Sequence, residues 1–259
     1  MNQLAVILPL HAPAPWLHQT LSSLKMQTKK SWDLVCTADA SSVDLLDEVE
    51  MSFPAAHRLI VPSGTPFPAV LNSAVQATSA RYIARIDQDD LAFRNRLEWQ
   101  FEAMERAPQL DVLCTPAIEI NPDGVPIGYR STGRWGLPRE LLLRNSIVHP
   151  SIMARRKSIE TVGLYDPLMT SAEDYDLWLR IALDGKIGVL KFPLTLYRRH
   201  AHQMSATWSM EDSVLNQLLK RKLRLGRSLR IPASLVRASH LAWSARHSNL
   251  SSLSIGNLD

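Results

Sequence analysis

The chain has 259 residues, of which 46% are hydrophobic and 21% are charged, a balance typical of a globular protein that buries a core. This composition excludes a disordered tail, and its ten glycines exclude a collagen-like chain. At roughly 150 residues per domain, the length indicates one large domain or one domain with an appendage. Cys36 and Cys114 are too few for a disulfide framework, so we expect a reducing compartment.

The apolar segments of the sequence are short. None approaches the roughly 18 residues that span a bilayer. The apolar run Leu4 to Leu10 precedes Ala12-Pro13-Ala14, which imitates a signal-peptide cleavage site. No Lys or Arg precedes this run and Pro9 interrupts it, so we interpret it as a buried first strand. We therefore expect a cytoplasmic protein.

Strand-like and helix-like patterns alternate through the first half of the chain. The pattern predicts strands at 4–8, 32–37, 58–61 and 81–86, and helices at 16–24, 43–51, 69–77 and 97–104. This alternation predicts right-handed crossovers and a mostly parallel sheet with helices on both faces, which is the α/β class. The second half is less regular. Residues 112–120 resemble one strand, Asn121-Pro122-Asp123-Gly124 a turn, and 125–130 the returning strand of a hairpin.

Three carboxylates follow the fourth predicted strand, at Asp87, Asp89 and Asp90. In an open α/β sheet, ligands bind beyond the carboxyl ends of the strands, so this position is suited to chemistry. Clustered carboxylates repel one another unless a positive group lies among them, and a hard cation such as Mg²⁺ or Mn²⁺ meets that need. The structural alternative is that Asp89 or Asp90 caps the helix that begins near Arg94.

A second acidic segment, Glu173-Asp174-Tyr175-Asp176, follows Ser171. The spacing from Ser171 to Asp174 matches a capping box, and acidic residues in a first turn are favoured by the helix dipole. The functional alternative is that Asp174 accepts a proton from an attacking hydroxyl group, a step worth roughly 10² to 10⁴ in rate. Sequence spacing leaves both interpretations open.

Together, the motifs resemble the GT-A glycosyltransferases of the large inverting family two. The resemblance covers about Leu4 to Ser205 and rests on segments that occur in the order seen in that family. These segments are the first strand ending in Pro9, Asp39 after the second strand, Leu71-Asn72, Tyr82-Ile83-Ala84-Arg85-Ile86-Asp87-Gln88-Asp89-Asp90, His149-Pro150-Ser151, Glu173-Asp174-Tyr175-Asp176-Leu177-Trp178-Leu179-Arg180 and Tyr197-Arg198-Arg199-His200.

The resemblance implies a metal-dependent enzyme that moves a sugar from a nucleotide diphosphate to a hydroxyl group of a glycan or lipid-linked acceptor, as in surface polysaccharide synthesis. A UDP-sugar is favoured, with dTDP- and GDP-sugars left open. Direct displacement with one base would invert the anomeric centre. A two-carboxylate hydrolase needs a second acid for its leaving group, a task that the metal removes.

The resemblance also implies roles for individual residues. Asp39 would bind the uracil ring, and Pro9 would lie in the same nucleotide site. Asp87 and Asp89 would hold the ribose and the diphosphate, Mn²⁺ or Mg²⁺ would be bound by Asp89 and Asp90, and Asp174 would be the base. The sequence departs from the family at Leu10-His11-Ala12 and at Ala38-Asp39-Ala40-Ser41. Because Ala40 stands in place of a Gly, we expect that loop to differ in shape.

Several further side chains have two interpretations. His200, with its neighbours Arg198 and Arg199, would cover the diphosphate or simply lie on the surface. His149 is either a buried structural histidine or a contact for the acceptor, beside Glu173. Trp135 would line an acceptor groove, since aromatic faces stack on sugars.

The C-terminal segment carries the excess of positive charge. From Ser213 to Leu258 there are eight Lys or Arg and no Asp or Glu. Apolar residues recur there at helical spacing, which predicts two amphipathic helices separated at Pro232. We therefore expect a catalytic domain at 1–205 and a basic helical extension at 206–259.

Basic amphipathic helices either contact a membrane surface or pack on protein. We thus expect a cytoplasmic protein, and peripheral contact with the cytoplasmic membrane face is one of the two interpretations of these helices. No nucleic-acid partner is expected, because no reading module accompanies the basic charge. The alternative to an enzyme is a non-catalytic protein of the same fold that binds membrane or a partner through these helices.

Overall fold

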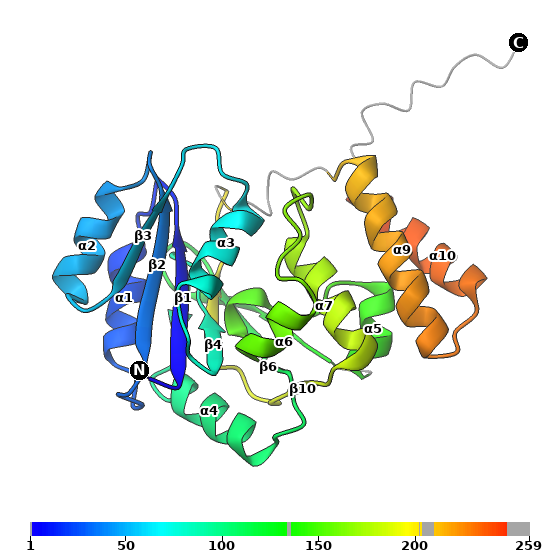
Figure 1. The fold of residues 1–259 in the computed structure, drawn as a ribbon, viewed down its shortest axis with the longest axis horizontal. Helices are drawn as coiled ribbons and strands as arrows, with labels where there is room; N and C mark the ends of the chain where they lie inside the picture. The colour runs from blue at the N-terminus through cyan, green and yellow to red at the C-terminus, as the bar shows by residue number, and fades with distance from the viewer. Residues whose placement is uncertain (1, 134–135, 202, 204–209, 248–259) are drawn as a thin grey trace, which may run out of the picture.

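The computed structural model describes residues 2–133, 136–201, 203 and 210–247, which form two β-sheets surrounded by helices (Figure 1). The main sheet has seven strands in the order β10-β6-β9-β4-β1-β2-β3, and a smaller sheet has the order β5-β11-β7-β8. The strands are β1 (Leu4–Leu10), β2 (Asp33–Asp39), β3 (His57–Val61), β4 (Tyr82–Arg85), β5 (Leu91–Ala92), β6 (Val112–Cys114), β7 (Ala117–Ile120), β8 (Pro126–Arg130), β9 (Met153–Arg155), β10 (Ile187–Val189) and β11 (Thr195–Arg198).

The first strand is buried along its whole length because both faces of the main sheet are covered. Its side chains alternate between two hydrophobic cores: Ala5 and Ile7 enter one, whereas Leu4, Val6 and Leu8 enter the other. The strand pairs in parallel with β2 on one side and β4 on the other. The carboxyl ends of these three strands therefore lie at one edge of the sheet.

The helices divide between the two faces. They are α1 (Leu17–Lys25), α2 (Asp44–Ser52), α3 (Phe67–Gln76), α4 (Arg96–Arg106), α5 (Leu137–Leu143), α6 (Arg156–Thr161), α7 (Glu173–Asp184), α9 (Asp212–Ser228) and α10 (Ala233–Ser244), with a 3₁₀ turn at His149–Ser151. Helices α1, α2 and α4 bury apolar residues in one core, and the other helices bury theirs in the second. The predicted α/β class is confirmed.

The predicted strand at 112–120 is wrong in its extent, because it is two strands in different sheets. Strand β6 ends at Cys114 and β7 begins at Ala117, with Pro116 between them. A proline has no backbone N–H to donate to a sheet, so the chain leaves the main sheet there. The predicted hairpin is confirmed: β7 and β8 are antiparallel, and the Asn121 side chain accepts the N–H groups of Asp123 and Val125.

Strand β9 makes the main sheet mixed rather than wholly parallel. It lies between β4 and β6 and is antiparallel to both. The pairs β1–β2, β1–β4, β2–β3 and β6–β10 are parallel. The expectation of a mostly parallel sheet therefore holds, although the sequence pattern of β9 gave no sign of its direction.

Both predicted C-terminal helices are present, as α9 and α10. Their apolar residues Val214, Leu218, Leu225 and Val236 belong to the same core as α5 and α7. Packing on protein therefore occupies much of the apolar face of α9. Contact with a membrane, and a domain boundary at 205/206, stay predictions. Among the described residues, no helix combines the length and apolar character needed to cross a bilayer.

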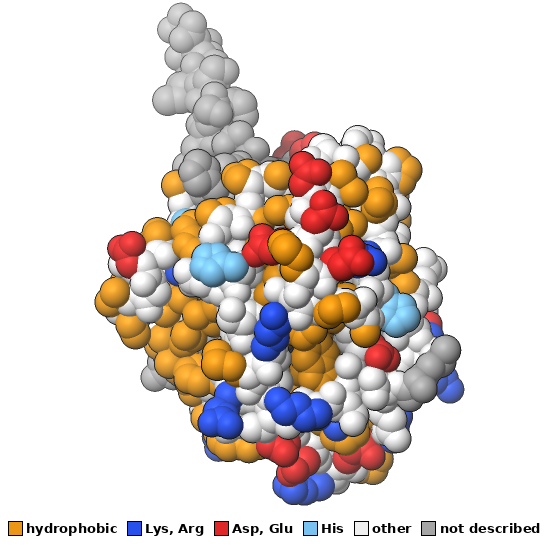
Figure 2. Space-filling view, turned by 90° about the vertical axis from the view of Figure 1, so that its left-hand side faces the viewer, with side chains coloured by type: hydrophobic (Ala, Val, Ile, Leu, Met, Phe, Trp, Pro, Cys, Tyr) orange, Lys and Arg blue, Asp and Glu red, His pale blue; other side chains and the backbone are white. Residues whose placement is uncertain are grey.

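The face that carries α2 and β3 has no single chemical character. In the space-filling view of this side, acidic and basic side chains are interspersed with hydrophobic ones (Figure 2). A nucleic-acid surface would show clustered basic residues. This face therefore gives no support to nucleic-acid binding.

Candidate active site

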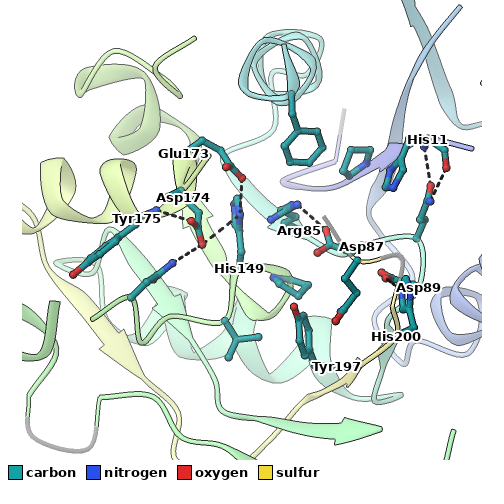
Figure 3. Close-up of a pocket in the computed structure, with 18 of the residues that line it drawn as sticks. His11, Arg85, Asp87, Asp89, His149, Glu173, Asp174, Tyr175, Tyr197 and His200 are labelled. Atoms are coloured by element: carbon teal, nitrogen blue, oxygen red, sulfur yellow. Dashed lines mark hydrogen bonds and ion pairs between the residues drawn. The ribbon is translucent and has the colours of Figure 1, made fainter. Parts of the chain in front are cut away.

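A cavity of about 830 Å³ lies at the carboxyl ends of β1 and β4. Its lining includes Pro9 and His11 after β1, Asp87 and Asp89 after β4, and the start of α7. The close-up shows two groups of side chains (Figure 3). His11, Asp89 and His200 lie at one end, Glu173, Asp174 and Tyr175 lie at the other, and Arg85 and Asp87 lie between them. The fold thus brings the two acidic segments of the sequence into one cavity.

The turn after β4 is fixed to the end of β1 by one glutamine. The Gln88 side chain accepts the backbone N–H of His11 at 2.8 Å and donates to the His11 carbonyl oxygen at 2.7 Å. Gln88 is buried, so these bonds are shielded from water. The glutamine inside the acidic motif therefore sets the distance between β1 and the carboxylates beside it.

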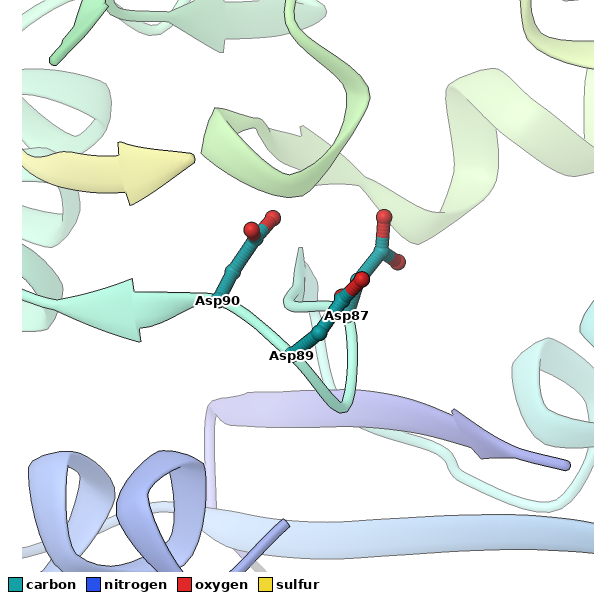
Figure 4. A group of neighbouring side chains, drawn as sticks. All are labelled: Asp87, Asp89 and Asp90. Atoms are coloured by element: carbon teal, nitrogen blue, oxygen red, sulfur yellow. The ribbon is translucent and has the colours of Figure 1, made fainter. Parts of the chain in front are cut away.

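This turn carries three aspartates (Figure 4), and their hydrogen-bond and ion-pair partners differ. Asp87 forms an ion pair with buried Arg85 at 2.7 Å, and Asp89 accepts a hydrogen bond from His200 Nε2 at 2.7 Å. Asp90 is fully buried, and its Oδ1 accepts the backbone N–H of Arg198. One carboxylate oxygen from each of the three lies within 4.8 Å of the others. The arrangement is compact enough for one cation.

Burial raises the pKa of Asp87 to about 6, although Arg85 opposes that shift. Burial, and then the nearby Asp89, raise the pKa of Asp90 well above its usual range. Such shifts mean that the chain alone does not fully compensate the charge of this cluster. A divalent cation would supply the missing positive charge.

Neither aspartate caps a helix, as the structural alternative proposed. Helix α4 begins at Arg96, and its N-cap residue Asn95 makes no side-chain cap bond. Asp90 instead ties the turn to β11 through Arg198. The capping explanation for Asp89 and Asp90 is wrong.

The second acidic segment is likewise not a capping box. Helix α7 begins at Glu173, after Ala172 in the left-handed conformation with φ 55° and no side-chain cap bond. The buried Ser171 Oγ has no partner among the described residues. A left-handed alanine is strained, and such strain gathers at functional sites. It turns the chain so that Glu173 and Asp174 line the cavity.

Asp174 is held by two neutral donors. Its Oδ2 accepts the Asn145 side-chain amide at 2.8 Å, and its Oδ1 accepts the backbone N–H of Tyr175 at 2.7 Å. Burial raises its pKa, and the Asn145 hydrogen bond opposes that shift. Burial and the neighbouring Asp174 raise the pKa of Glu173. One proton is therefore retained readily by this pair.

His149 faces this pair of carboxyl groups. Its Nδ1 lies 3.9 Å from Glu173 Oε1 and 3.9 Å from Asp174 Oδ2, and its Nε2 lies 2.8 Å from the Tyr165 hydroxyl. The ring packs edge-on against Trp178, with centroids 5.4 Å apart. Burial, and then the charge of Arg85, lower its pKa well below the usual range. The ring is therefore neutral.

Most of the predicted site residues lie in this cavity. Pro9, Asp87, Asp89, His200, His149, Glu173 and Asp174 line it. Asp90 lies behind the lining, and Asp39 lies outside it at the end of β2, where its carboxylate accepts the N–H and hydroxyl of Ser41. Trp135 lies outside the described residues. The roles of all these residues stay predictions.

Two buried arginines lie beside the acidic turn, and one of them differs from its sequence interpretation. Arg85, on β4, is buried and forms an ion pair with Asp87. Arg198 neither covers the diphosphate nor lies on the surface. It is fully buried, and its guanidinium donates to the carbonyl oxygens of Asp89, Asn121 and Pro122.

Sequence reasoning also missed side chains that lie far from the motifs. Asn145 has no pattern around it, and Trp243 and His247 come from the C-terminal segment. The apolar residues that recur at helical spacing in that segment predicted helices and nothing about a cavity. Only the way the chain folds back brings them to the site.

Comparisons with known proteins agree with this geometry. The model of the family described as Glycosyl transferase family 2 matches residues 5–163. An uncharacterized glycosyltransferase of Methanocaldococcus jannaschii is 25% identical over 226 residues, which cover 84% of this chain and 74% of that protein. The amylovoran biosynthesis glycosyltransferase AmsE of Erwinia amylovora is 24% identical over 174 residues, covering 64% of this chain and 63% of that one.

Among solved structures, the crystal structure of S. aureus TarS 1–349 in complex with UDP-GlcNAc matches with a TM-score of 0.73 and 15% identity, covering 99% of this chain and 76% of that one. This match shows that the fold is the expected GT-A fold. The family match covers more than half of the chain. The chain therefore belongs to glycosyl transferase family 2 and is a glycosyltransferase.

Proposed function

We propose that this protein transfers a sugar from a nucleotide diphosphate sugar, with a UDP-sugar preferred to dTDP- or GDP-sugars, to a hydroxyl group of a glycan or lipid-linked acceptor. The proposal rests on one feature of the cavity, which holds a carboxylate triad at one end and a buried carboxyl pair at the other. The UDP-GlcNAc bound to TarS supports a uridine nucleotide.

The triad fits Mn²⁺ or Mg²⁺ by its chemistry. Carboxylate oxygens are the ligands that these hard cations prefer, and a buried oxygen, Asp90 Oδ2, has no hydrogen-bond partner among the described residues. Asp89 and Asp90 would hold the ion, with Asp87 toward the ribose and His200 beside Asp89. A bound ion neutralises a diphosphate and makes it a better leaving group.

Asp174 is the proposed base. The acceptor oxygen attacks the anomeric carbon, its proton passes to an Asp174 carboxylate oxygen, and the bond from that carbon to the diphosphate oxygen breaks with its electron pair on the oxygen. One direct displacement inverts the anomeric centre. Asn145 and the Tyr175 N–H hold Asp174 in place for this step.

His149 is a positioning residue in this scheme. If the Tyr165 hydroxyl donates to Nε2, the neutral ring carries its proton on Nδ1, which faces Asp174 and Glu173. The ring thereby presents a donor to the ionised base without adding positive charge. We assign it to the acceptor side together with Glu173.

The acceptor is the broadest part of the proposal. The amylovoran enzyme belongs by its name to polysaccharide biosynthesis. We propose a similar role in surface polysaccharide synthesis, in the cytoplasm at the membrane face where lipid-linked acceptors are available. The exposed Leu235 and Leu241 of α10, beside the exposed Arg237, are the residues that would touch such a surface.

Thermal unfolding with UDP, with Mn²⁺ and with both tests the proposal. Metal and diphosphate bind as a unit, so UDP with Mn²⁺ should raise the Tm clearly more than either component alone. Release of free nucleotide from UDP-, dTDP- and GDP-sugars then identifies the donor. If neither nucleotides nor metal change the Tm, the alternative of a non-catalytic binding protein replaces this proposal.

A further inference from the structure

The C-terminal end of α10 forms part of the cavity wall at the end that carries the proposed base, Asp174, which we call the base end. Trp243, Arg246 and His247 all line the cavity. The Trp243 ring lies 5.4 Å from the ring of Tyr175, the residue that follows Asp174. Residues about seventy positions apart in the chain are therefore neighbours beside the proposed base.

This wall is rigid because its aromatic rings are packed around a buried lysine. Lys222 of α9 is fully buried, with its Nζ 4.4 Å from the Trp243 ring centroid and 5.1 Å from that of Tyr175. Trp243 also stacks on His247 at 4.5 Å, and the Tyr175 hydroxyl donates to the Leu141 carbonyl oxygen at 2.6 Å. The cavity-facing rings are therefore held before any ligand arrives.

Three further arginines line the cavity, and two of them can be placed relative to Asp174. Arg144 follows α5 directly and precedes Asn145, the donor to Asp174. The charge of Arg130 contributes to lowering the pKa of Asp174, which places this arginine near the base. Both line the cavity together with Arg246.

These arginines differ in whether they form ion pairs within the protein. Arg144 is paired with Glu140 at 2.6 Å, and Arg130 lies 3.9 Å from Glu119. The guanidinium of Arg246 has no hydrogen bond or ion pair within the described part of the chain, and it is exposed to the cavity mouth. An unpaired guanidinium beside a rigid indole suits a ligand with an anionic group next to a sugar ring.

We infer that the end of α10 is an acceptor subsite, and that the acceptor carries a phosphate or a carboxylate near the hydroxyl that receives the sugar. The packed Trp243 and His247 rings form the apolar wall against which the acceptor sugar lies, and Arg246 binds the anion, with Arg144 lining the same cavity. The inference rests on the proposed function, because it assumes that the Asp174 end of the cavity receives the acceptor.

Binding of three small probes to the full chain, saturated with UDP and Mn²⁺, tests this subsite. The probes are glucose 1-phosphate, glucuronate and neutral glucose, each measured by calorimetry. Saturation with UDP keeps the phosphate probe out of the end of the cavity that carries Asp87 and Asp89, which we call the donor end. We expect at least one anionic probe to bind about tenfold or more tightly than glucose. Preference for the phosphate or for the carboxylate probe identifies which anion the acceptor carries.

Arg246→Gln should abolish this preference, and Arg237→Gln, an exposed arginine of α10 outside the cavity lining, should leave it unchanged. Equal affinity for charged and neutral probes, or an Arg246→Gln protein that binds as the parent does, would overturn the subsite. The UDP and Mn²⁺ stabilisation measured in the same samples separates the two proposals. If it persists while the anion preference is absent, only the acceptor subsite fails.

Discussion

The two ends of the cavity hold acidic residues in opposite ways. At the donor end, Asp87 is paired with Arg85 and Asp89 with His200, so cationic or protonatable side chains stand beside the carboxylates. At the base end, Asp174 is held by an amide and a backbone N–H, and its histidine neighbour is neutral. These environments fit the proposed roles, which are metal binding at the donor end and proton transfer at the base end.

Under the proposed function, this difference separates the tasks of the two acidic segments. Carboxylates that bind a metal must be ionised, and nearby cations favour that state. A carboxylate that acts as a base must accept a proton near neutral pH, and burial with neutral donors favours that behaviour. Each of the following predictions changes a residue at one end of the cavity, or in its packing, and measures transfer, nucleotide binding or stability.

Asp174→Asn should give the largest effect. Transfer should fall by roughly 10² to 10⁴, because the base is lost, while stabilisation by UDP with Mn²⁺ stays at the parent value. Initial rates of nucleotide release with acceptor, together with thermal unfolding, measure the two ends. Asp184→Asn, at the exposed end of the same helix, is the control. Transfer that survives in Asp174→Asn would remove this residue from its role.

Asp89→Asn should damage the donor end instead. We expect Mn²⁺-dependent UDP binding to weaken on the order of 100-fold, because a charged ligand becomes neutral. Calorimetric titration with UDP at fixed Mn²⁺ measures this loss, and Asp44→Asn at the exposed start of α2 is the matched control. The same titration on Asp90→Asn tells whether this buried aspartate is a ligand, as predicted. Unchanged UDP binding by Asp90→Asn would show that Asp90 is not a metal ligand and that its role is the hydrogen bond to Arg198 of β11.

The pH dependence of transfer sharpens the comparison at the base end. Asp174 acts only when ionised, and burial raises its pKa, so the rate should fall as the pH drops through a value above the usual aspartate range. The Asn145 hydrogen bond opposes that shift, so Asn145→Ala should move the acid limb to higher pH. Profiles of kcat against pH for both proteins measure the limb. A limb that moves to lower pH would contradict the assignment.

Lys222→Met should change the stability of the fold and leave the binding of UDP and Mn²⁺ at the donor end unchanged. Burial lowers the pKa of Lys222 to about 7, whereas an unfolded lysine titrates near 10.4. The lysine therefore destabilises the fold fully below pH 7, and this cost disappears as the pH rises toward the unfolded value. We expect the methionine to raise the free energy of unfolding by about 1 to 2 kcal/mol at pH 6 and by less at pH 9.

Denaturant unfolding at the two pH values measures the Lys222→Met effect, with Lys220→Met, on the exposed face of α9, as the control. UDP and Mn²⁺ binding should stay unchanged, because the donor end lies elsewhere in the cavity. An equal gain in the free energy of unfolding at both pH values would show that burial does not lower the pKa of Lys222.

The parts of the site that the sequence predicted follow from local rules. Asp87 and Asp89 come directly after a buried parallel strand, and parallel strands end at one edge of a sheet. Glu173 and Asp174 begin a helix whose apolar pattern is plain. The alternation of strands and helices likewise gave the class of the fold.

The parts that were missed depend on distant contacts. Pro116 separates β6 from β7, which the sequence pattern predicted as one strand. Strand β9 is antiparallel to its neighbours, and no pattern in its sequence indicates that direction. Arg85 is indistinguishable in sequence from a surface arginine until Asp87 lies beside it. Trp243 reaches the cavity only because α9 and α10 fold back onto α7.

The most direct test of the account is a crystal of the protein grown with UDP and Mn²⁺, with the anomalous signal of manganese recorded. The account predicts one manganese peak against the carboxylate of Asp89, shared with the diphosphate of UDP. A nucleotide bound in the cavity with no manganese peak among Asp87, Asp89 and Asp90 would contradict it.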